Sequence, residues 1–169
     1  MRPYSRIALI ALAAFASCKG RSREDMLSRK WQEVSVENPQ MEAAITKELA
    51  KLDALQDSDT AILHGVYRTS TADSARAFGK AAIAEQRKMQ EDVIRGSWFN
   101  FEKDGKLQMH SPRGTDNVKW TLKDDRILVT KEGVPKPKEW KVTHLSDTAL
   151  HIVAANSNVS YNVRFHPAN

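Results

Sequence analysis

Two different spacings of hydrophobic residues divide the chain at about residue 97. Over residues 38–95, apolar residues recur at intervals of three or four, which is the period of an amphipathic helix. The first such stripe consists of Met41, Ile45, Leu49, Leu52, Leu55, Ile62 and Val66. Asn38 and Pro39 precede it as a capping residue and a first-turn proline. The pattern therefore predicts a helix that begins here, with a weak point at the polar stretch 56–60.

A second helix is predicted over residues 72–95. Residues 70–73 (STAD) have the spacing of a capping box. The expected apolar side carries Phe78, Ala82, Met89 and Val93. Residues 38–95 therefore predict an αα-hairpin, which must bury its apolar stripes within itself or against a sheet.

From Ser97 onward, hydrophobic and polar residues alternate with a period of two, which is typical of half-buried strands. Asp104-Gly105 lies between two such runs and is a strong hairpin signal, because both turn positions favour positive φ. Further turns are expected at Asp124-Asp125, at residues 134–138 and at residues 156–158. With a first strand over residues 27–36, the chain holds about eight short strands.

These elements predict an α+β, mainly β fold. Regular short strands joined by tight turns favour an antiparallel meander that forms a barrel or half-barrel, with the αα-hairpin inserted after the first strand. Eight strands enclose just enough room for side chains or for one small ligand.

The first 17 residues have the layout of a secretory signal peptide. Arg2 and Arg6 are followed by an uncharged apolar run over residues 7–16. A membrane-spanning helix needs about 20 apolar residues, and this run is half as long. Residues 1–17 are therefore expected to be removed.

Ala16-Ser17-Cys18 resembles the lipobox of bacterial lipoproteins, although Phe15 stands where that family usually has Leu. In that family the cysteine receives a diacylglycerol and becomes the first residue of the mature protein. The resemblance implies lipidation of Cys18 and a place in the cell envelope, in the outer membrane of a Gram-negative bacterium. Cys18 is the sole cysteine of the chain, so it has no disulfide partner.

The remaining sequence fits one domain. Residues 18–26 are charged and lack periodicity, and we interpret them as the lipidated cysteine and a tether, with a single domain over residues 27–169. The formal net charge of +5 includes the two leader arginines. The other charges are evenly mixed, which disfavours nucleic acid as a partner.

The strand pattern resembles the small lipocalin-like lipoproteins of Bacteroidetes-type bacteria. The similarity covers residues 27–36 and 97–166 and includes KWTLKDDRILV and WKVTHLSDTALHI. Two departures are Arg29, where lipocalins have Gly before the first-strand Trp, and the insertion 38–95. The resemblance implies a calyx that binds a small apolar ligand. The aromatic residues that fill such a barrel or line its cavity would be Trp31, Trp98, Phe101, Trp120, Trp140 and Tyr161.

No sequence motif indicates catalysis. The chain lacks a nucleophile elbow, a glycine-rich phosphate loop and any thiol after Cys18. Its five histidines are scattered, and the alternation of residues predicts that His144 and His151 point to opposite faces. We therefore expect no metal, no cofactor and no enzymatic activity.

Two functions remain open at this stage. The first is a lipid-anchored module that binds a small apolar ligand. The second is an interaction or scaffold module that presents the helical hairpin to an envelope protein. An enzyme would require a pocket with two titratable groups in convergent geometry.

Replacing Cys18 with Ala is expected to release the protein from the membrane fraction, because attachment then loses its acyl chains. Cell fractionation and metabolic labelling with a radioactive fatty acid measure this. Ser17→Gly, which keeps a small residue before the cysteine, serves as the matched control and should remain labelled. A Cys18→Ala product that stays membrane-bound would refute the assignment.

Overall fold

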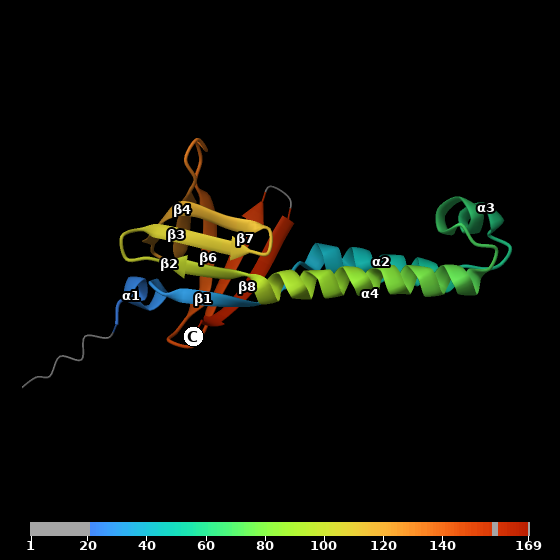
Figure 1. Ribbon diagram of the computed structural model, residues 1–169, viewed down its shortest axis with the longest axis horizontal. Coiled ribbons are helices and arrows are strands. Elements are labelled where there is room, and N and C mark those ends of the chain that lie inside the picture. The colour runs from blue at the N-terminus through green and yellow to red at the C-terminus, as the bar shows by residue number, and fades with distance from the viewer. Residues whose placement is uncertain (1–20, 157–158, 169) are drawn as a thin grey trace, which may run out of the picture.

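The structure is a computed structural model that describes residues 21–156 and 159–168. The predicted signal peptide, Cys18 and the first residues of the predicted tether lie outside the described residues, as do two residues of the predicted turn at 156–158. Eight antiparallel strands form a closed barrel, in which each strand pairs with its neighbour in sequence and β1 pairs with β8 (Figure 1). The predicted antiparallel meander and the α+β, mainly β class are confirmed.

The strands are between 4 and 10 residues long. They are β1 (Lys30–Glu37), β2 (Trp98–Phe101), β3 (Lys106–Ser111), β4 (Gly114–Lys123), β5 (Arg126–Thr130), β6 (Lys138–Leu145), β7 (Leu150–Asn156) and β8 (Val159–Pro167). Alternate residues point into the barrel, as the period of two requires. The buried residues of the barrel core are Leu27, Trp31, Phe101, Leu107, Val118, Trp120, Ile127, Val129, Trp140, Val142, Leu150, Ile152, Val163 and Phe165.

Two tight turns follow the chemistry that the sequence predicted. Gly105, between β2 and β3, has φ +84°, a conformation that side chains disfavour. Asp124, between β4 and β5, has φ 55°, which aspartate tolerates better than most residues. The Asp104 carboxylate accepts a hydrogen bond of 3.1 Å from the backbone N–H of Lys106 and so supports the first turn.

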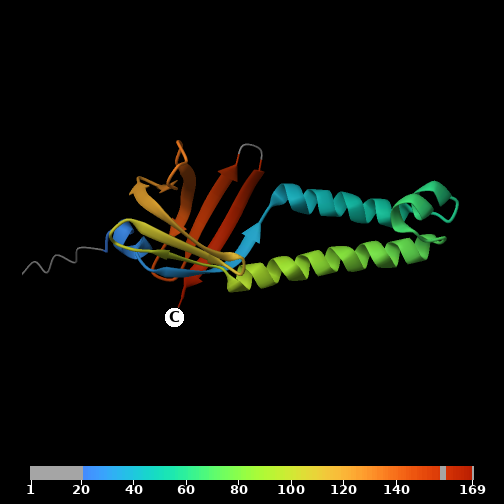
Figure 2. The same ribbon diagram turned by 45° about the horizontal axis from the view of Figure 1, so that its top comes forward.

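The insertion between β1 and β2 is a helical hairpin that projects from the barrel (Figures 1 and 2). It consists of α2 (Pro39–Ala54), α3 (Thr60–Ile62), a π-helical turn η1 (Leu63–Tyr67) and α4 (Ala72–Gly96). The Asn38 side chain accepts hydrogen bonds from the backbone N–H groups of Gln40 and Met41, which caps α2 as predicted. Because α2 ends at Ala54 and α3 begins at Thr60, the first predicted helix is broken at residues 55–59, close to the expected weak point.

The two long helices of the hairpin pack closely in its distal half and diverge toward the barrel, where an ion pair bridges them (Figure 2). Gly79 of α4 packs against the buried Leu52 of α2 so closely that an added Cβ would lie 2.6 Å from a Leu52 methyl group. Ion pairs join Lys80 to Asp53 at 2.8 Å and Arg87 to Glu42 at 3.0 Å. A separate small core at the distal end contains Leu63, Ala72 and Ala75, with Leu55 and Tyr67 packed against it.

The expected apolar side of α4 is not the side that packs. Phe78 is 65% exposed and Met89 is 55% exposed, whereas the buried positions are Ala72, Ala75 and Gly79. Small residues allow the backbones of α2 and α4 to approach, and larger side chains at the same positions would hold the helices apart. The prediction for Phe78, Ala82, Met89 and Val93 was therefore wrong about which face of α4 is buried.

The hairpin neither fills nor caps the barrel. None of the buried residues of the barrel core comes from residues 38–96. The hairpin leaves the barrel beside the β3–β4 turn, where Gly96 lies against Pro112, and it extends along the long axis of the molecule (Figure 1). Within residues 21–156 and 159–168, no helix combines the length and apolar character needed to cross a bilayer.

The predicted tether differs from the structure over its last residues. A short helix, α1 (Arg23–Leu27), replaces the irregular chain expected through residue 26, and β1 begins at Lys30 rather than residue 27. Ser22 caps α1, because its hydroxyl accepts a hydrogen bond from the backbone N–H of Asp25. Leu27 is completely buried in the barrel core, so this segment belongs to the folded domain.

Candidate functional site

One end of the barrel is closed by α1. The indole N–H of Trp31 donates a hydrogen bond of 2.9 Å to the carbonyl of Leu27, which holds the helix over the barrel opening. Ion pairs attach the same segment to two turns at this end: Asp25 to Lys103 of the β2–β3 turn and Arg29 to Asp147 of the β6–β7 turn. We call this the α1 end.

Aromatic side chains fill the middle of the barrel. Phe99 contacts three other rings, with centroid distances of 5.0 Å to Phe165, 5.5 Å to Trp140 and 6.4 Å to Phe101. Phe101 meets Trp120 edge to face at 5.3 Å. These separations are typical of favourable aromatic pairs, so the layer forms a solid floor rather than a channel.

The opposite end of the barrel contains a pocket of about 300 Å³. Six lining residues are apolar and belong to the barrel wall: Met109, Val118, Val129, Trp140, Ala154 and Ala155. Trp140 stacks on Phe99 and so joins the pocket lining to the aromatic floor. Val134, in the β5–β6 loop, adds an apolar side chain that is 45% exposed. We call this cavity the mouth pocket.

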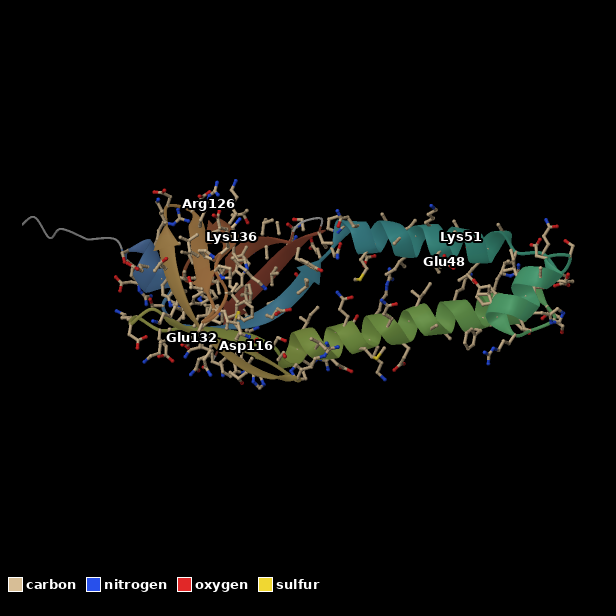
Figure 3. All side chains as sticks on the ribbon, turned by 90° about the horizontal axis from the view of Figure 1, so that it is seen from above. Glu48, Lys51, Asp116, Arg126, Glu132 and Lys136 are labelled. Carbon is tan, nitrogen blue, oxygen red and sulfur yellow. The ribbon has the colours of Figure 1, made fainter. Side chains whose placement is uncertain are left out.

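Charged residues surround the mouth pocket in a single layer. Two residues beyond the apolar wall the position is charged in three places: Asp116 of β4 precedes Val118, Lys131 follows Val129 just after β5 ends, and Lys138 of β6 precedes Trp140. Lys136 joins them from the β5–β6 loop. Figure 3 shows Asp116 and Lys136 well apart on the barrel. Lys136 and Lys138, together with the ion pair of Lys131 and Asp116, give the rim a net positive charge.

One lysine of this rim is ion-paired to a described residue and the other two are not. Lys131 and Asp116 form an ion pair of 2.8 Å. Among the described residues, Lys136 and Lys138 have no hydrogen bond or ion pair to a side chain. Glu132 of the same loop lines a different depression, with Lys106 and Lys119, on the outer side of the sheet. The arrangement provides an apolar cavity with two unneutralised ammonium groups at its opening.

The six aromatic residues singled out in the sequence have different places. Trp31, Phe101 and Trp120 are buried in the core, Tyr161 packs against the core half-buried, and Trp140 lines the mouth pocket. Trp98 alternates with the inward-facing Phe99 and therefore lies on the outer face, where it stacks on His110 at 4.9 Å and beneath the Lys30 ammonium. Sequence reasoning chose Trp98 and missed Phe99, because alternation alone does not show which of two adjacent aromatic residues points inward.

The expected placement of His144 and His151 on opposite faces was wrong. The register of β6 and β7 shifts between Val142 and His144, so His144 pairs directly with His151 and their ring centroids lie 5.0 Å apart. Burial, together with the nearby His144 and Arg164, lowers the pKa of His151. In the part of the chain that the structure describes, no cluster of three or more His, Cys, Asp or Glu is suited to hold a metal ion.

A second depression lies outside the barrel, where α4 meets β1 and β8. It measures about 560 Å³ and is lined by Gln32, Glu33, Val34, Glu91, Ile94, Arg95 and His166. The Gln32 amide donates hydrogen bonds to the carbonyls of Ser97 and Arg95, which satisfies the C-terminal end of α4. Burial raises the pKa of the Glu33 carboxyl to about 7. Glu33 pairs with Phe165, which is buried in the barrel core, so its side chain leaves β1 on the inner face, beside this joint between hairpin and barrel.

Comparison with known proteins provides little further information. No protein-family model and no curated protein matches the sequence. Among solved structures, the chain aligns with a DUF4847 family protein from Bacteroides vulgatus at a TM-score of 0.40 and 13% sequence identity. The alignment covers 85% of this chain and 95% of that chain.

Replacing Glu33 with Gln is expected to stabilise the fold above pH 7. The folded-state pKa of about 7 exceeds the ordinary value of 4.5, so the folded protein holds the proton more tightly and its stability falls as pH rises between these values. The variant should match the parent at pH 4 and exceed it at pH 8 by on the order of 1–2 kcal/mol, allowing for partial solvation. Urea unfolding across this pH range measures the difference.

Glu91→Gln, an exposed position in the same depression, is the matched control for the loss of one acid. If the unfolding free energies of the parent and Glu33→Gln run parallel from pH 4 to pH 8, the assignment of a raised pKa to Glu33 is wrong.

Proposed function

We propose that this protein is a lipid-anchored component of the bacterial cell envelope whose lipocalin-like barrel binds one small apolar ligand in the mouth pocket. It acts in this proposal as a binding module and not as an enzyme. The observation that carries the proposal is the unfilled, mainly apolar volume at one end of an otherwise closely packed barrel.

The size and lining of the mouth pocket support ligand binding. Its volume of about 300 Å³ lies at the lower end of the range of small-molecule sites, about 300–1,000 Å³. Such sites combine an apolar lining with a few polar groups that fix the orientation of the ligand. The aromatic floor beneath Trp140 limits the depth of entry, so the proposed ligand is small.

The position of the N-terminal segment supports the proposed anchoring. Arg21, the first described residue, forms an ion pair of 2.9 Å with Asp147 at the α1 end. A lipid on Cys18 would therefore place the α1 end toward the membrane. The mouth pocket lies at the opposite end and would open into the aqueous compartment, where a soluble ligand can reach it.

Purified protein is expected to bind the neutral apolar dye prodan with an increase in its fluorescence, because the mouth pocket removes the dye from water. Ala154→Phe should reduce binding at least about fivefold, since the added ring occupies the pocket where Ala154 lines it. Fluorescence titration measures both affinities. Thr121→Phe, which adds the same ring at an exposed position of β4, should bind as the parent does.

Equal loss of dye binding in both Phe variants would show that the pocket is not the binding site. The absence of saturable binding to the parent would contradict the proposed function itself.

The exposed face of α4 favours a second candidate function, capture of an envelope protein by the hairpin. Phe78, Met89 and Val93 are exposed along one side of this helix. Glu85 and Asp92 follow the same side, and neither forms an ion pair with a described residue. An apolar strip beside two acids is complementary to a partner helix with an apolar strip and basic flanks.

Deleting residues 38–95 should remove such a partner surface while leaving a folded barrel, because the core contains no residue of the hairpin. Trp98 pairs with Gln32, so the ends to be joined are separated by about 16 Å along β1, which a flexible linker of about eight residues spans. Near-ultraviolet circular dichroism measures the fold. Photo-crosslinkers placed at Met89 and, as a control, at the exposed Ala84 on another side of α4 measure capture in whole cells.

Crosslinked partners at Met89 but not at Ala84, lost on deletion, would support capture. Identical crosslinking from both positions would contradict it, and an unfolded deletion variant would show that the hairpin is required for the barrel to fold.

A further inference from the structure

We propose that the ligand of the mouth pocket is an amphipathic anion, with a short apolar body inside the barrel and an anionic head at Lys136 and Lys138. This inference rests on the proposed ligand-binding function and adds the chemical class of the ligand. It covers carboxylates and phosphates alike, since both offer a negatively charged head to an ammonium group.

The layered structure of the pocket separates the two parts of such a ligand. The wall layer contains Val118, Val129 and Trp140, and all three are buried. The next inward-facing positions toward the opening hold Asp116, Lys131 and Lys138. Successive inward positions lie about 6.6 Å apart along a strand. An apolar body in the wall layer therefore places its head at the level of the lysines.

The register of the sheet aims Lys138 toward the pocket. Lys138 pairs with Val129 across β5 and β6, and Ile127 pairs with Trp140. Paired residues project from the same face of a sheet, and Val129 and Trp140 face the interior. The Lys138 side chain therefore leaves β6 on the inner face, although its ammonium group remains close to solvent.

The β5–β6 loop holds Lys136 over the same opening. Lys136 stands between Pro135 and Pro137. A residue before proline is restricted to extended conformations, and each proline fixes its own φ. This stretch therefore loses little conformational entropy when Lys136 orders around a bound anion. Val134, exposed at the same opening, would be covered by the ligand.

The charge balance of the rim selects the sign of the head group. The pocket lining has three lysines and one acid, and that acid is paired with Lys131. Lys136 and Lys138 keep their charge unneutralised by described residues. An anion placed between them relieves their mutual repulsion, whereas a cation would add to it.

The volume limits the body of the ligand. If each group the size of a water molecule takes about 15–30 Å³, the 300 Å³ pocket holds about 10–20 non-hydrogen atoms. Octanoate matches this size, and octanol, octyl phosphate and octylamine share its chain with different heads. These four compounds are suitable probes of the head group.

The test is displacement of prodan from the purified protein by each of the four compounds. Octanoate and octyl phosphate should bind about tenfold more tightly than octanol, and octylamine should bind most weakly. Octanol is the less water-soluble compound, so a pocket without lysines would prefer it to octanoate. Raising the salt concentration should weaken the binding of the two anions and leave that of octanol unchanged.

The double variant Lys136→Gln/Lys138→Gln should lose the preference, so that octanoate binds no more tightly than octanol. Lys123→Gln/Lys141→Gln is the matched control, because it removes the same charge from exposed residues that do not line the mouth pocket, and it should keep the tenfold preference. The relative affinities of octanoate and octyl phosphate then indicate whether the head is a carboxylate or a phosphate such as that of a lipid fragment.

The possible failures are distinguishable. If octanol displaces prodan as well as octanoate does, or if both double variants behave alike, the anionic head is refuted while the binding of an apolar ligand stands. If prodan binds but no eight-carbon compound displaces it, the proposed ligand class is refuted. If prodan itself does not bind the parent protein, the proposed function and this inference fail together.

Discussion

The pairing of β1 with β8 is the constraint on which the other features of the molecule depend. It closes the sheet and leaves the barrel with no free edge. The pairing of β1 with β2 ends at Gln32, whereas its pairing with β8 continues to Glu37. The neighbouring edge of β1 is thereby left for the root of α4, and the insertion can leave the barrel without interrupting its closure. The same continuation pairs Glu33 with the core residue Phe165, where its carboxyl is poorly solvated.

Most of the barrel could be predicted from the sequence, because each strand and turn has a local cause. The alternation from Val159 to Phe165 and the positive φ required at Gly105 depend on nearby residues alone. The local sequence does not show which residues of each strand face the interior, because a shift of one residue exchanges the two faces. Trp98 and Phe99 are both aromatic, and only pairing with Gln32 and Met109 decides between them. The register shift before His144 is likewise a tertiary feature.

The helices and the candidate site were harder to predict for a related reason. Hydrophobicity ranks Phe78 and Met89 above Ala75 and Gly79, whereas the close contact with Leu52 of α2 requires Gly79, and Ala75 packs in the small distal core. The aromatic floor was foreseeable in composition, since five of the six selected aromatic residues pack in or against the barrel core. The lysine rim was not, because barrel closure brings together positions from β4, β6 and the β5–β6 loop that have no local signature.

The docking of α1 has a mechanical consequence for the proposed anchored form. The folded domain begins at about Arg21 and not at residue 27. Three residue steps therefore separate Cys18 from Arg21, which is ion-paired with Asp147. This segment spans at most about 11 Å. So short a segment would keep the barrel close to the bilayer and would restrict its rotation. In the proposed anchored form the barrel would stand on the lipid surface, and α4, about 37 Å long, would hold the distal end of the hairpin at a fixed distance from the membrane.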